Sequence, residues 1–255
     1  MVQNYLTPLL VVGLFAGMLV MVELGQRLGE RSLVRDPAPP TGTGPLEAAV
    51  FGLFGLLMAF TFGGGAERLN LRRQLVVAEA NAIGTAYLRV DLLPAAEQPA
   101  MRERFRAYVD GRLATYRKLA DLAAAEQELA RSAKLQAEIW SEAVRGCGGT
   151  APCTHMLLPA LNEMIDVVTT RTVAARTHTP WLVYALLFVL ALGCSLIAGY
   201  GMAGGKTKGR LYVFGFTMIT ILTIYVILDM EFPRLGIIKV NSFDQSLYEL
   251  RESMK

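Results

Sequence analysis

The stretch Ala48-Ala-Val-Phe-Gly-Leu-Phe-Gly-Leu-Leu-Met-Ala-Phe-Thr-Phe-Gly-Gly-Gly-Ala66 decides the fold, because none of its residues carries a charge. A helix needs about 20 mostly apolar residues to cross about 30 Å of hydrocarbon. Three further stretches without Asp, Glu, Lys or Arg are similarly long: Met1–Val22, Thr177–Gly205 and Leu211–Leu228. The sequence therefore predicts four membrane spans, at about 5–22, 48–66, 180–202 and 211–228.

The composition supports a membrane protein and excludes other classes. Of the 255 residues, 53% are hydrophobic and only 18% are charged, whereas a soluble domain has about 25% charged residues. The 25 Lys and Arg are interspersed with 22 acidic residues, without a basic tract, so no nucleic-acid partner is expected. Met1–Val22 has no basic residue at its start and no small-residue cleavage site after it, which predicts a retained first span.

The polar middle of the chain is predicted to be helical. Apolar residues recur there at steps of three and four, which is the period of an amphipathic helix. We expect one helix to continue from the second span to about residue 93, a second to run from 105 to 144, and a third to run from 156 into the third span. The predicted fold is an all-α membrane protein with a first transmembrane hairpin (1–66), an extramembrane helical domain (67–177), a second hairpin (178–230) and an amphipathic tail (231–255).

The charges around the spans suggest an orientation. The two short loops are basic, and positive loops usually stay in the cytoplasm; their cations are Arg27, Arg31, Arg35, Lys206, Lys208 and Arg210. This places the helical domain and both termini in the periplasm of a bacterial inner membrane, although five arginines also flank that domain. Cys147 and Cys153 could form a disulfide, which needs an oxidising compartment; two unpaired thiols are the alternative.

The second span carries two patterned faces. Small residues recur on one face at steps of three or four, which lets helices approach closely; they are Ala48, Gly52, Gly55, Ala59 and Gly63. Gly13 and Gly17 form a shorter version in the first span. On another face Phe54, Met58 and Phe62 repeat at four, and in a symmetric oligomer they would form stacked apolar rings able to gate ions. Contact with lipid or with a neighbouring helix explains the same repeat.

Other motifs give little support for catalysis or metal binding. Cys147, Cys153 and His155 fit no common zinc spacing, and Gly204-Gly-Lys-Thr207 lacks the first glycine of a phosphate-binding loop. Asp229 and Glu231 end the fourth span, which also carries a stripe of threonines at 217, 220 and 223; we expect the carboxylates to pair with Arg234, although an acidic ring that attracts cations is the alternative. We expect no enzyme, no metal and no cofactor.

Four segments resemble the bacterial bestrophin-like family of membrane proteins: Arg72–Arg89, Leu158–Asp166, Ala198–Met202 and Leu228–Gly236. The family's distant likeness to bestrophins implies a homo-oligomer, a pentamer by resemblance alone, that conducts inorganic ions through a pore lined by the second span. Phe54, Met58 and Phe62 would then form the constriction. The chain departs from bestrophins in its predicted periplasmic domain and in the absence of a clear acidic calcium-binding segment after the fourth span.

Two functions follow from these observations. The first is an oligomeric ion channel in the lipid bilayer. The alternative is a non-conducting membrane scaffold or sensor whose helical domain binds a partner.

Overall fold

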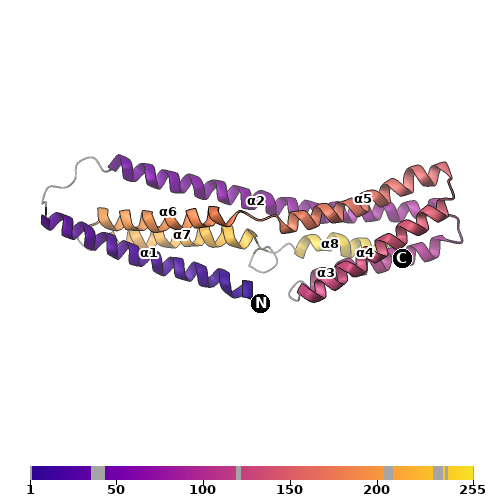
Figure 1. The fold of residues 1–255 in the computed structure, drawn as a ribbon, viewed down its shortest axis with the longest axis horizontal. Helices are drawn as coiled ribbons and strands as arrows, with labels where there is room; N and C mark the ends of the chain where they lie inside the picture. Colours follow the sequence, from indigo (N-terminus) through magenta and orange to yellow (C-terminus); the bar gives the residue numbers. More distant parts are fainter. Residues whose placement is uncertain are drawn as a thin grey trace. The chain divides into compact units, whose positions relative to one another are not determined.

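The computed structural model describes residues 2–35, 44–118, 122–203, 209–231, 238 and 241–254. Its elements are, in order, α1 (Val2–Arg35), α2 (Gly44–Leu88), the 3-10 helix η1 (Arg89–Leu92), α3 (Gln98–Arg117), α4 (Leu122–Cys147), α5 (Ala151–Arg176), α6 (Trp181–Gly201), α7 (Gly209–Glu231) and α8 (Asn241–Ser253) (Figure 1). The described residues contain no strand, and four helices are long and apolar enough to cross a membrane. The predicted all-α membrane fold is therefore confirmed.

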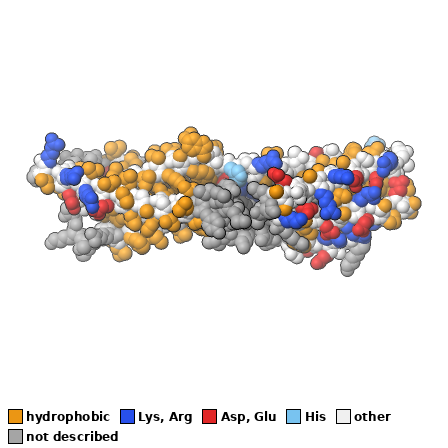
Figure 2. Space-filling view, turned by 60° about the horizontal axis from the view of Figure 1, so that its bottom comes forward, with side chains coloured by type: hydrophobic (Ala, Val, Ile, Leu, Met, Phe, Trp, Pro, Cys, Tyr) orange, Lys and Arg blue, Asp and Glu red, His pale blue; other side chains and the backbone are white. Residues whose placement is uncertain are grey.

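The chain divides into two compact units. Unit 1 comprises residues 1–69 and 178–238, and unit 2 comprises residues 70–177 and 239–255. Hydrophobic side chains dominate the visible surface of the apolar helices of unit 1, whereas charged side chains are interspersed over unit 2 (Figure 2). Such a difference is expected if unit 1 lies in lipid and unit 2 in water.

In unit 1, α1 packs closely on α6 through glycines. A Cβ atom added to Gly25 would lie 2.1 Å from the backbone oxygen of Leu196, and one added to Gly199 would lie 2.1 Å from that of Val22. The two backbones therefore touch where neither residue has a side chain. A shared core continues from this contact into α2 and α7; its buried residues are Val11, Leu14, Met18, Phe54, Leu187, Ala191, Cys194, Ile224, Ile227 and Leu228.

Unit 2 is a helical domain in which α3 and α4 form an antiparallel hairpin. Residues early in α3 contact residues late in α4: Arg104 is 2.7 Å from Glu142, and Gln136 donates a hydrogen bond to the Tyr108 hydroxyl. The predicted single helix from 105 to 144 is thus wrong. The sequence between Arg117 and Leu122 contains neither Gly nor Pro, so the hairpin follows from packing between the two helices and not from a local breaker.

The predicted continuous helix from 156 into the third span is also wrong, because α5 ends at Arg176 and α6 begins at Trp181. Thr177 and Pro180 have extended backbone angles, with ψ of 115° and 134°. Pro180 cannot donate a backbone hydrogen bond, and it disfavours helical geometry in the preceding residue. The extension of α2 beyond the second span does occur, and it ends in η1 at Leu92.

Candidate functional site

The apolar part of α2 is the least covered of the four spans. In its most apolar 18-residue window only 11% of the residues are buried, against 28% in each of the other three. The small residues lie on this uncovered side: Ala48 and Ala59 are exposed, and a Cβ added at Gly52, Gly55 or Gly63 would meet nothing within 4 Å. The small-residue face of α2 therefore packs against no part of the chain that the structure describes.

The three residues predicted as a constriction do not share one exposed face. Phe54 is only 2% exposed and belongs to the core of unit 1, where Met58 packs beside it. Phe62, in contrast, is 42% exposed. Because Phe54 contacts helices of its own chain, it cannot also project into a pore shared with other subunits in this conformation.

A different set of apolar side chains projects from the open side of α2. Leu53, Leu56 and Phe60 follow one another at steps of three and four, so they lie on one helix face. All three are exposed, Phe60 by 70%. This set, named here the α2 outer face, is an exposed apolar surface available to lipid or to another subunit.

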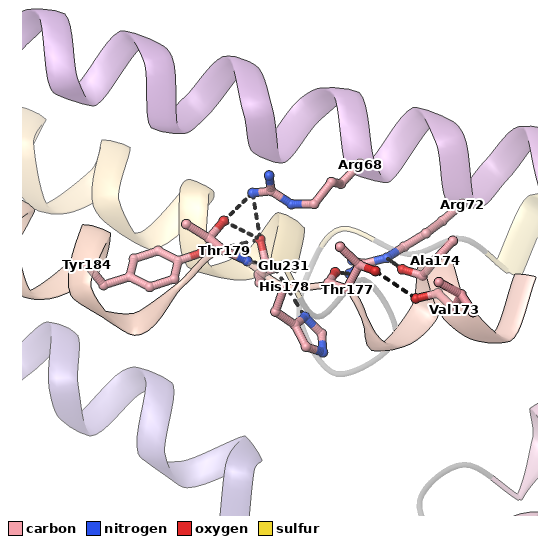
Figure 3. A network of polar contacts seen from close by, with 9 residues as sticks. All are labelled: Arg68, Arg72, Val173, Ala174, Thr177, His178, Thr179, Tyr184 and Glu231. Atoms are coloured by element: carbon pink, nitrogen blue, oxygen red, sulfur yellow. Dashed lines mark hydrogen bonds and ion pairs between the residues drawn. The ribbon is translucent and has the colours of Figure 1, made fainter. Parts of the chain in front are cut away.

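A buried carboxylate anchors one end of unit 1. Glu231, the last residue of α7, has a side chain that is 2% exposed. Its carboxylate accepts hydrogen bonds from the Arg68 guanidinium at 3.0 Å, from the Thr179 backbone N–H at 2.8 Å and from the Tyr184 hydroxyl at 3.2 Å (Figure 3). The Nδ1 atom of His178 lies 3.2 Å from the same carboxylate.

This Glu231 cluster connects three helices and the segment before α6. Arg68 comes from α2, Tyr184 from α6 and Glu231 from α7, while the extended backbone at residues 177–180 leaves the Thr179 N–H outside any helix and able to donate to Glu231. Burying a carboxylate costs several kcal/mol unless a cation and hydrogen-bond donors compensate it. The cluster therefore fixes α2 to α6 and α7 at the end of the spans.

Sequence reasoning missed this arrangement because Arg68 is separated from Glu231 by most of the chain. The expected partner, Arg234, lies outside the described residues. The second terminal carboxylate, Asp229, accepts a hydrogen bond from the backbone N–H of Ile238 at 2.7 Å. Of the threonine stripe on α7, Thr217 and Thr220 are buried, and Thr223 donates to the carbonyl of Ile219.

Unit 2 contains its own buried charge cluster. Glu79 from α2 is fully buried and forms ion pairs with Arg112 of α3 and Arg171 of α5. Asp244 of α8 lies 3.8 Å from Arg171. Burial acts to raise the pKa of the Glu79 carboxyl, but the two guanidinium groups outweigh it and hold the pKa below its ordinary value. Glu79 is therefore ionised in the folded protein.

The structure joins Cys147 at the end of α4 to Cys153 near the start of α5 by a disulfide. Zinc binds cysteine as a thiolate, and the sulfurs of a disulfide are not thiolates, so Cys147 and Cys153 cannot ligate zinc together with His155 while they are joined. Among the described residues no group of three His, Cys, Asp or Glu side chains could hold a metal ion.

Four apolar helices, an all-α architecture and a charged helical unit define a multi-pass membrane protein. The chain belongs to the bestrophin-like family, because the family model described as "Bestrophin-like domain" matches residues 12–242. No curated protein and no solved structure matches the chain. The resemblance inferred from the four sequence segments is therefore confirmed.

Proposed function

We propose that this bestrophin-like protein forms a homo-oligomeric ion channel whose pore is lined by α2. Family membership supports the class of function, and the low burial of α2 carries the assignment of the helix. In a ring of subunits, a helix lining the axis keeps one face uncovered by its own chain. The α2 outer face fulfils this requirement, so Leu53, Leu56 and Phe60 replace Phe54, Met58 and Phe62 as the proposed constriction.

The chemistry of this face suits a gate that works by dewetting. Rings of apolar side chains in a narrow pore expel water and so block ions without a charged barrier. The neighbouring small residues Gly52, Gly55 and Ala59 would let α2 helices of adjacent subunits approach closely. No catalytic activity is part of this proposal.

Flux through liposomes tests the proposal. The purified protein should catalyse ion flux above that of protein-free vesicles, and Phe60→Ala should raise it several-fold because it removes the largest side chain of the face. Phe214→Ala is the matched control, since Phe214 is an exposed phenylalanine on α7. Native mass spectrometry of both variants reports the subunit number. A monomer, the absence of flux, or equal flux in the two variants would contradict a pore lined by α2.

We also propose that unit 2 lies in the periplasm of a bacterial inner membrane. The disulfide between Cys147 and Cys153 suits an oxidising compartment, and the short loops at the other end of the spans are basic. Introduced cysteines test this orientation. The free cysteine among the described residues, Cys194, is buried and should not react with a soluble reagent. Ser141 in unit 2 and Val34 at the end of α1 are exposed, so each is replaced by Cys in turn. In spheroplasts a membrane-impermeant maleimide should label Ser141→Cys and should label Val34→Cys only after permeabilisation. The reverse pattern would place unit 2 in the cytoplasm.

A further inference from the structure

One side of α1 beyond its apolar part is fixed against α6. Gly25 and Gly29 lie against the backbone around Leu196 and Tyr200, and the Tyr200 hydroxyl donates a hydrogen bond to the Ser32 hydroxyl at 3.1 Å. Tight backbone contact and a hydrogen bond hold this end of α1 in one orientation. The side of the helix that lies about 100° around from these contacts is therefore presented outward in a defined way.

That outward side changes from apolar to basic along the helix. Leu24, Leu28, Arg31 and Arg35 follow at steps of four, three and four, so they share one face. Both leucine side chains are exposed. An apolar side chain gains free energy when it is removed from water, so an apolar ligand would stabilise this position. Beside this face lies a hollow of about 310 Å³ lined by Arg27, Glu30, Arg31 and Val34.

The basic groups on and beside this face are only partly neutralised by the residues that the structure describes. Arg27 donates to Glu23 at 2.9 Å in an exposed pair. Arg31 and Arg35, in contrast, form no ion pair or hydrogen bond with any residue that the structure describes.

We propose that this face of α1 binds an anionic phospholipid. The phosphate and headgroup contact Arg31, which lines the hollow, and Arg35 one turn further along the helix, and an acyl chain lies along Leu24 and Leu28. Guanidinium groups suit phosphate because they donate two parallel hydrogen bonds, and the exposed leucines explain why a lipid fits better than a soluble anion. The site is independent of the proposed pore, since no residue of α2 contributes to it.

Native mass spectrometry of the full-length protein in detergent tests the lipid site. Phosphatidylglycerol and phosphatidylcholine with identical acyl chains are titrated against wild type, and the wild-type protein should retain phosphatidylglycerol more strongly. Each arginine near an anionic headgroup contributes about fivefold in affinity. The R31Q/R35Q variant should therefore bind phosphatidylglycerol about 25-fold more weakly and phosphatidylcholine unchanged.

The matched control is R131Q/R145Q, which removes two exposed arginines of α4 in unit 2. It should bind both lipids like wild type. Thermal unfolding of R31Q/R35Q should equal that of wild type, because the replaced side chains have no partners among the described residues. Equal retention of the two lipids by wild type, or the same loss in both double variants, would overturn the proposal.

Discussion

Two glycine-bearing faces in unit 1 differ in what they contact. Gly25 and Gly199 lie where the backbones of α1 and α6 touch, so a methyl group at either position would collide with a carbonyl oxygen. Gly52, Gly55 and Gly63 on α2 have open space around them. The same residue type thus closes one interface inside the chain and leaves another face free for contacts outside it. Spacing along the sequence does not distinguish these two cases.

The largest expected effect comes from adding a side chain where the backbones of α1 and α6 touch. Gly199→Ala should lower the free energy of unfolding by about 3 kcal/mol, because the added methyl meets backbone that cannot rotate away. Thermal unfolding in detergent, followed by size-exclusion chromatography, measures this loss. Gly13→Ala is the control on α1, since a Cβ there meets nothing within 4 Å. Equal stability of the two variants would show that α1 and α6 are not in close contact.

A smaller loss is expected when α2 is detached from the Glu231 cluster. Arg68→Gln leaves a buried carboxylate without its cation, which should cost about 2 kcal/mol because Arg68 is partly exposed. The R68Q/E231Q double variant should recover part of this loss, since it removes both charges. Thermal unfolding of wild type, R68Q, E231Q and the double variant gives the coupling free energy between the two side chains. Additive losses would mean that the ion pair does not hold α2.

A large side chain on the small-residue face of α2 should affect assembly and leave the folding of each chain unchanged. If α2 packs against a second copy, Gly55→Leu should shift the native mass towards smaller oligomers by crowding the small-residue face. Its monomer should unfold within about 0.5 kcal/mol of wild type. Gly215→Leu on α7, where a Cβ also meets nothing within 4 Å, is the control for a face outside the proposed interface. Unchanged mass in both variants would indicate that the α2 glycines face lipid.

The smallest expected effect is a pH dependence of stability. It concerns the buried charge cluster of unit 2 and not the glycine contacts of unit 1. The pKa of Glu79 is lowered on folding, so its contribution to stability is present above the carboxyl's unfolded pKa and is lost as pH falls through the folded pKa. Trp140 of α4 reports on unit 2 when Trp181 is replaced by Phe. Its thermal transition should fall with acidification below about pH 4. The E79Q variant should show a flatter profile; an identical profile would assign the acid sensitivity to other groups.

The four spans could be predicted because the absence of charge over a bilayer's width is a local property of the chain. The separation into α3 and α4 could not be predicted, since it depends on contacts such as that of Arg104 with Glu142 and the intervening sequence lacks Gly and Pro. Among the glycines of α1, the sequence pointed to Gly13 and Gly17, yet α6 packs most closely on Gly25 and Gly29. Small residues indicate that close contact is possible, but the partner helix determines where it occurs.

The candidate site shows the same limit. A repeat of four correctly places Phe54 and Met58 on one face of a helix, but it does not say whether that face turns inward or outward. The core residues of α1, α6 and α7 determine this orientation, and they leave the opposite face of α2 open. Glu231 was visible as a carboxylate at the end of a span, whereas its pairing with Arg68 required the positions of α2 and α7.

The disulfide of unit 2 spans the turn at Gly148–Thr150 and the first two residues of α5, and all five of these residues are exposed. Exposed turns are preferred sites of proteolytic cleavage. A protease that cuts one peptide bond in this turn would therefore release no fragment, because Cys147 and Cys153 would still hold the two pieces together. On a gel the nicked chain would migrate at full size until a reductant was added, so intact mobility without reductant would not demonstrate an uncut chain.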